Sequence, residues 1–119
     1  MSYLIDTHAH LDFPELYSKL DLIIENAKNQ NVLKIITIST NLNKIGKIIQ
    51  ISNDYDVVYF TVGVHPNEVL KDKDYENYFL ISDISNNLKC VGIGECGLDY
   101  HFGNEDKEKQ KLSDRKSTR

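Results

Sequence analysis

The sequence predicts an α/β fold built on a parallel β-sheet. Short apolar segments alternate along the chain with longer segments whose apolar residues recur at helical spacing. The apolar segments are continuous rather than alternating between apolar and polar residues, which is typical of parallel strands covered on both faces. Alternating β and α elements with short connections imply right-handed crossovers between neighbouring strands.

The predicted strands are rich in β-branched and aromatic residues. They lie at residues 3–7, 32–38, 57–62 and 90–93. The third strand ends at the segment Gly63-Val64-His65-Pro66, and the fourth runs into a glycine-containing segment.

Three helices are predicted between these strands. The first begins near Pro14, a residue favoured in the first turn of a helix, and its apolar side chains continue at helical spacing to about Asn29. The second follows Asn41, which is a favourable N-cap residue, and covers residues 42–52. The third has a weaker pattern and covers residues 75–88.

Polar side chains stand where the predicted strands end. His8 and His10 follow the first strand, His65 the third, and Glu95 and Asp99 the fourth. In α/β barrels the active site lies at the carboxyl ends of the strands. Any one of these residues, taken alone, is explained as the cap of a turn. Polar residues at the ends of several strands favour a shared site.

The first strand places Asp6, His8 and His10 on one face, because side chains alternate between faces with a period of two residues. Neutral imidazole suits zinc and other first-row divalent metals, so the two histidines can converge on one ion. Asp6 can supply a further ligand or orient a histidine. A single His-x-His pair, however, more often closes a strand and faces water.

Glu95 adds a carboxylate to the histidine pair. A carboxylate can bridge two metal ions, and two divalent ions about 3.5–4 Å apart can bind a hydroxide nucleophile and a phosphate oxygen together. The alternative is a buried carboxylate paired with an interior cation. His65 can donate to a phosphate, lie near the metal, or bond a loop carbonyl. Asp99 can orient a metal ligand without contacting the ion itself.

Composition predicts an ordinary cytoplasmic protein. The formal net charge of -4 gives no general attraction to nucleic acid, although a basic groove can exist locally. We identify no apolar segment long enough to cross a membrane and no secretory signal. The two cysteines, Cys90 and Cys96, fit free thiols in a reducing compartment.

Three motifs occur in order: D-T-H-A-H-L-D at 6–12, V-G-V-H-P at 62–66, and G-I-G-E-C-G-L-D-Y at 92–100. Together they resemble the N-terminal half of the TatD family of metal-dependent DNases. The resemblance covers roughly residues 1–103 and implies about four β/α units of a (β/α)8 TIM-type barrel. It also implies hydrolysis of phosphodiester bonds in DNA at two divalent ions, which could be magnesium, manganese or zinc.

The resemblance carries roles to individual residues. His8 and His10 match positions that bind one metal, and Glu95 matches the position that bridges both metals. The resemblance implies that Glu95, His65 and Asp99 are catalytic. His65 and Asp99 match motif positions near the site. The family's later ligands, two histidines and an aspartate, have no counterpart in this sequence.

We therefore expect a truncated barrel domain over residues 1–103, followed by a charged, disordered tail over residues 104–119. A complete barrel of this type takes about 250 residues. Half a barrel has an unpaired edge and an uncovered face, so we expect instability, self-association, or pairing with a complementing C-terminal half. The alternatives are a decayed, non-catalytic fragment, a metal-binding half-domain, and a metal-dependent hydrolase of another substrate.

Overall fold

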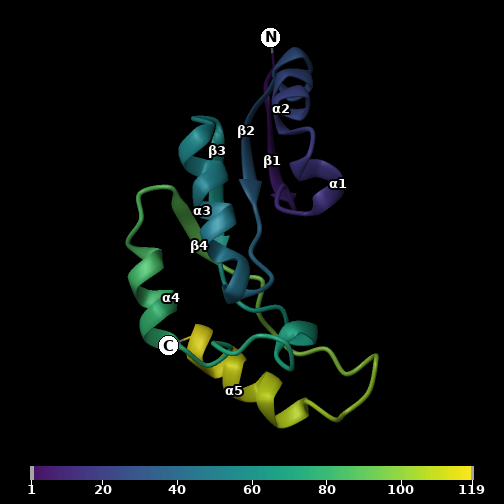
Figure 1. The fold of residues 1–119 in the computed structure, drawn as a ribbon, viewed down its shortest axis with the longest axis vertical. Coiled ribbons are helices and arrows are strands. Elements are labelled where there is room, and N and C mark those ends of the chain that lie inside the picture. The colour runs from purple at the N-terminus through teal and green to yellow at the C-terminus, as the bar shows by residue number, and fades with distance from the viewer. Residues whose placement is uncertain (1, 119) are drawn as a thin grey trace.

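Four parallel strands form one sheet in the order β1-β2-β3-β4 in the computed structural model, which describes residues 2–118 (Figure 1). The strands are β1 (Leu4–Ala9), β2 (Val32–Thr37), β3 (Val58–Val62) and β4 (Cys90–Ile93). Consecutive strands along the chain are neighbours in the sheet, so all four carboxyl ends point the same way. The prediction of a parallel α/β fold is confirmed.

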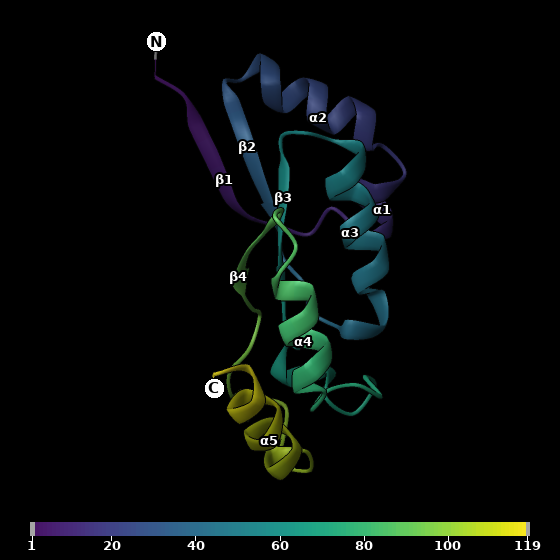
Figure 2. The ribbon, with the colours of Figure 1, turned by 90° about the vertical axis from the view of Figure 1, so that its left-hand side faces the viewer.

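Helices connect the strands and cover one face of the sheet (Figure 2). They are α1 (Pro14–Tyr17), α2 (Leu20–Asn29), α3 (Ile45–Asp54) and α4 (Tyr78–Ser85), with short 3-10 turns η1 (Leu42–Lys44) and η2 (Pro66–Glu68). The sheet was expected to be covered on both faces, but the described helices cover only one. Within residues 2–118, no helix combines the length and apolar character needed to cross a membrane.

The core lies between the helices and the covered face of the sheet. Alternate residues of β3, namely Val58, Phe60 and Val62, are fully buried on that face. One apolar cluster joins Phe60 and Val62 to α3 and α4, and a second joins Val58 to α2 and β2. The alternation follows from the strand's two-residue period, which directs these three side chains to the same face.

Both edge strands carry exposed apolar side chains. Leu4 and Ile5 of β1 are 61% and 51% exposed, and Val91 and Ile93 of β4 are 51% and 42% exposed. Strand edges and apolar surfaces of this kind are unusual in a stable monomer and favour association. Instability or association of the chain stays a prediction.

Several helix boundaries differ from the predicted ones: the second helix is α-helical only from Ile45 and runs to Asp54, and the third ends at Ser85 rather than 88. The helix expected over residues 14–29 is divided at Lys19, whose backbone is not helical, although the apolar spacing continues across the break. The third helix starts at Tyr78 rather than 75, because the Asn77 side chain accepts a hydrogen bond from the backbone N–H of Leu80 (3.0 Å) and caps it there.

The expected disorder of residues 104–119 also differs from the structure, in which Lys107–Ser117 forms helix α5. Polar side chains anchor this helix: Gln110 is fully buried, and its amide group exchanges two hydrogen bonds of 2.8 Å with the backbone of Asp99. Disorder was expected because the segment has few apolar residues. That criterion does not detect a polar side chain, such as Gln110, that is buried by hydrogen bonding. The domain boundary at residue 103 stays a prediction.

Candidate metal centre

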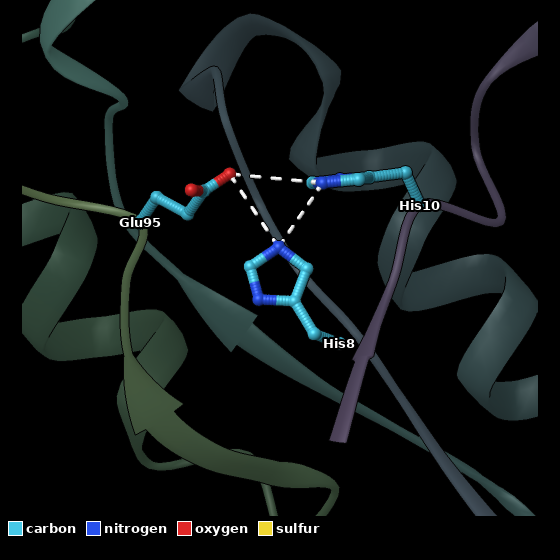
Figure 3. Close-up of side chains that lie close together, drawn as sticks. All are labelled: His8, His10 and Glu95. Atoms are coloured by element: carbon cyan, nitrogen blue, oxygen red, sulfur yellow. Dashed lines mark hydrogen bonds and ion pairs between the residues drawn. The ribbon is translucent and has the colours of Figure 1, made fainter. Parts of the chain in front are cut away.

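His8, His10 and Glu95 converge at the carboxyl end of the sheet (Figure 3). The Nε2 atoms of His8 and His10 lie 3.3 Å apart. Glu95 Oε2 lies 4.0 Å from His8 Nε2 and 3.7 Å from His10 Nε2. One ligand atom from each of the three residues thus lies within 4.8 Å of the others. Two imidazoles and a carboxylate are a donor set that suits zinc and other first-row divalent ions.

The His10 ring is oriented by its second nitrogen. His10 Nδ1 lies 3.3 Å from the backbone carbonyl oxygen of Ile38. A carbonyl can only accept, so this hydrogen bond requires the proton on Nδ1 and leaves Nε2 of the neutral ring as an acceptor that faces His8 and Glu95. Metal-binding histidines in proteins are commonly held by such a bond. The Phe13 ring stacks on His10 at 4.7 Å and 12° and restrains it further.

Glu95 is held by backbone contacts to the neighbouring strand ends. Its N–H donates to Ser39 O (2.7 Å), while the preceding Gly94 donates its N–H to Val62 O (2.9 Å) and accepts from Thr61 Oγ1 (2.7 Å). These bonds connect the segment after β4 to the ends of β2 and β3. The carboxylate is therefore positioned by the order of the strands in the sheet.

Close backbone approach at Gly63 makes this arrangement possible. A Cβ atom at position 63 would lie 2.6 Å from Glu95 O and 2.7 Å from Gly94 C, which is closer than real contacts allow. We expect Gly63→Ala to displace the end of β4, to lower the free energy of unfolding by about 1–3 kcal/mol, and to weaken metal binding. Chemical denaturation and Co²⁺ titration would measure these effects.

Gly46→Ala is the matched control for Gly63→Ala. A Cβ atom at position 46 meets no atom within 4 Å, and the residue lies inside α3, where alanine is favoured over glycine by about 1 kcal/mol. We expect this variant to keep its metal binding and to be at least as stable as the wild type. Equal behaviour of the two variants would contradict the tight approach at Gly63.

His65 lies beside the cluster, on the other carboxylate oxygen. His65 Nε2 is 4.0 Å from Glu95 Oε1, and its Nδ1 accepts a hydrogen bond from the N–H of Asn67 (3.1 Å). An accepting Nδ1 carries no proton, so the neutral ring carries its proton on Nε2. His65 is thereby arranged as a donor toward Glu95 or toward a bound anion, rather than as a metal ligand through Nε2.

Asp99 and Asp6 lie outside the three-residue cluster. Asp99 accepts hydrogen bonds from the Asn67 side chain (3.0 Å) and from the backbone N–H of His101 (3.0 Å). The bond from His101, followed by the bond from Asn67, lowers the pKa of Asp99, so it stays a carboxylate at neutral pH. Asn67 therefore links Asp99 to His65 by hydrogen bonds. Asp6 accepts from the backbone N–H of His8 (3.0 Å).

The cysteines are free thiols and show no sign of being ligands. Burial raises the pKa of Cys96, and the negative charges of Asp114 and Glu95 raise it further. Burial also raises the pKa of Cys90, although hydrogen bonds from backbone groups oppose it. Metal binding needs the thiolate, so both shifts work against a cysteine ligand.

A cavity of about 340 Å³ adjoins the cluster. His10, His65 and Glu95 line it, together with Thr40, which was expected there because it ends the second predicted strand, and with four residues that the sequence did not single out for this site: Phe13, Lys44, Asn67 and Glu68. All five lie in loops or turns that follow β1, β2 or β3. The rule that active sites form at the carboxyl ends of parallel strands points to these loops, but it does not select residues within them.

A parallel α/β sheet that brings two histidines and a carboxylate together at its carboxyl end is typical of the class of metal-dependent β/α-barrel proteins. The model of the family described as TatD related DNase matches residues 5–114, and the chain belongs to this family. The resemblance seen in the three motifs is confirmed.

Relatives and solved structures agree with this assignment. The chain is 35% identical over 108 residues to YabD of Bacillus subtilis, whose name is uncharacterized metal-dependent hydrolase. It is 33% identical over 105 residues to human TATDN3, whose name is deoxyribonuclease. The crystal structures of the TatD homolog YJJV from Escherichia coli and of a TatD family hydrolase from Entamoeba histolytica match with TM-scores of 0.80 and 0.78, both at 30% identity.

The chain spans less than half the length of these proteins. The matches cover 91% of this chain and 42% of YabD, and 82% of this chain and 38% of TATDN3. They cover 95% and 96% of this chain but 44% of each crystal structure. The prediction that the chain corresponds to the N-terminal half of a (β/α)8 barrel is confirmed.

Proposed function

We propose that the chain supplies the N-terminal half of the active site of a divalent-metal-dependent hydrolase that cleaves phosphodiester bonds of DNA. The observation that carries this proposal is the convergence of the His8, His10 and Glu95 ligand atoms within 4.8 Å. Membership of the TatD related DNase family and the name of human TATDN3 favour DNA as the substrate.

Each residue has a distinct proposed role. His8, His10 and Glu95 would together hold one divalent ion, and the carboxylate of Glu95 would also serve a second ion. Bound divalent ions of magnesium, manganese or zinc would polarise the phosphate and lower the pKa of a bound water. His65 donates from Nε2 to Glu95 or to a phosphate oxygen, and Asp99 positions His65 through Asn67.

The remaining ligands of a two-metal centre are proposed to come from a complementing C-terminal half or from a second copy of the chain. The described residues bring three such side chains together, and the exposed edges β1 and β4 are where additional strands would pair. The specific alternative is a half-domain that binds one ion without hydrolysis, which the small number of converging ligands favours.

The proposal is tested by Co²⁺ titration followed by visible absorption, and by hydrolysis of a labelled single strand of DNA with Mg²⁺, Mn²⁺ or Zn²⁺. We expect near-stoichiometric binding by the wild type, loss of binding in His8→Ala, and no change in His101→Ala, whose exposed ring lies outside the cluster.

Three outcomes of this test are informative. Metal-dependent hydrolysis that disappears in His8→Ala supports the full proposal. Co²⁺ binding without hydrolysis supports the metal-binding half-domain. Failure of the wild type to bind any divalent ion contradicts both.

A further inference from the structure

We propose that Lys44 and Phe13 form a nucleotide subsite beside the metal cluster, where Lys44 binds a phosphate of single-stranded nucleic acid and Phe13 stacks against a base. This inference rests on the proposed function and names how the same site would hold its substrate. It concerns two residues of this chain and needs no residue from outside it.

The cavity connects the two side chains to the cluster. Lys44 and Phe13 line the same cavity of about 340 Å³ as His10 and Glu95. A substrate whose phosphate contacts a metal at the cluster would therefore extend along a wall that these two residues form. Phosphate recognition and base recognition require different chemistry, and the wall offers an ammonium group for the first and an aromatic ring for the second.

Among the residues that the structure describes, Lys44 is the only lysine or arginine that lines this cavity. It is exposed, and among residues 2–118 it has no ion-pair partner within 4.0 Å. The carboxylate of Glu68 also lines the cavity, but its Oε2 accepts a hydrogen bond from Asn41 Nδ2 (3.3 Å). An unpaired ammonium in a cavity with two carboxylates favours an incoming anion that would otherwise be repelled.

The turn that carries Lys44 is fixed by hydrogen bonds. The Lys44 N–H donates to Asn41 O (3.1 Å), and the Asn41 side chain accepts from the N–H of Asn43 (2.8 Å). The N–H of Leu42 donates to the buried carboxylate of Asp72 (2.5 Å). The backbone of η1 is thus held in place, and the flexible side chain of Lys44 starts from the rim of the cavity.

Phe13 offers the aromatic surface. One face of its ring stacks on His10, yet the residue is 41% exposed, so we assign the opposite face to a base. Its backbone is anchored by a bond from Phe13 N–H to His10 O (3.1 Å) and by acceptance of the Leu16 and Tyr17 N–H groups. Stacking on an aromatic ring tolerates every base, so this subsite would hold a strand without reading its sequence.

Binding of fluorescein-labelled single strands, measured by anisotropy in EDTA so that nothing is hydrolysed, tests the proposal. Two strands are compared: a short thymidine oligonucleotide, and the same backbone with abasic sites. We expect Lys44→Ala to weaken both and to reduce the slope of log affinity against log salt by about 0.7. We expect Phe13→Ala to weaken only the thymidine strand, by about tenfold.

Matched controls separate the subsite from general effects. Lys47→Ala removes a nearby lysine whose ammonium lies over the Tyr17 ring at 3.8 Å, and Phe79→Ala removes a phenylalanine that is 83% exposed on α4. We expect both to bind as the wild type does. Phe13→Leu keeps an apolar side chain against His10 but no aromatic ring, so it should repeat the loss seen in Phe13→Ala, with an unchanged far-UV circular dichroism spectrum.

The proposal is overturned if Lys44→Ala behaves like Lys47→Ala, if Phe13→Ala weakens both strands equally, or if the wild type binds neither strand. Its failure is distinguishable from failure of the metal site, because Lys44→Ala should keep the Co²⁺ binding of the wild type. A chain that binds no Co²⁺ but shows the expected strand selectivity would refute the metal centre and leave the subsite standing.

Discussion

Glu95→Gln is expected to weaken divalent-metal binding by about 100- to 1000-fold, because it removes the only negative charge in the cluster and keeps the side chain's shape. Glu95 Oε2 lies within 4.0 Å of Nε2 of both His8 and His10, and among residues 2–118 no other carboxylate belongs to this group. The backbone bonds that hold Glu95 do not involve its side chain. Co²⁺ titration should therefore show the loss without a change in the unfolding midpoint.

Glu68→Gln is the appropriate control for this variant. Glu68 lines the same cavity and carries the same charge, but it does not belong to the three-residue cluster. Glutamine can still accept the hydrogen bond from Asn41, so the local structure should persist. Equal Co²⁺ affinity in the two variants would show that the cavity's overall charge, and not the position of Glu95, governs binding.

The sequence was sufficient for the sheet and for the cluster, for a physical reason. Uninterrupted apolar segments are stable as parallel strands that are buried on both faces. Parallel strands place their carboxyl ends at the same edge of the sheet. His8 lies in β1 and His10 follows its last residue, so the extended backbone's two-residue period brings their rings to one face. Glu95 joins them because the sheet order places the end of β4 at the same edge.

Other features depend on contacts that no local pattern records. The stacking of Phe13 on His10 and the position of Lys44 at the cavity are set by loops that fold back over strand ends. Asp99 was grouped with the site by its motif, but its hydrogen-bonded link to His65 runs through Asn67. Helix α5 was missed because Gln110 is buried by hydrogen bonding rather than by apolar contact.

Phe60→Ala is expected to lower the free energy of unfolding by about 3–5 kcal/mol. Phe60 is the largest fully buried side chain among residues 2–118. It belongs to β3, and its ring packs against α3 and α4. Truncation of Phe60 leaves a cavity in the apolar core that it shares with α3 and α4. This core supports β3, the strand that leads to Gly63 and His65. Urea denaturation followed by circular dichroism measures the change, and reduced Co²⁺ binding should accompany it.

Phe79→Ala provides the comparison for Phe60→Ala, because Phe79 is 83% exposed and should cost little. Typical domains are stable by only about 5–15 kcal/mol, and here one face of the sheet has no described helix against it. The loss of Phe60 can therefore consume most of the available stability. A Phe60→Ala variant as stable as Phe79→Ala would contradict the packing of β3, and with it the scaffold that holds His65 and Glu95 at one edge of the sheet.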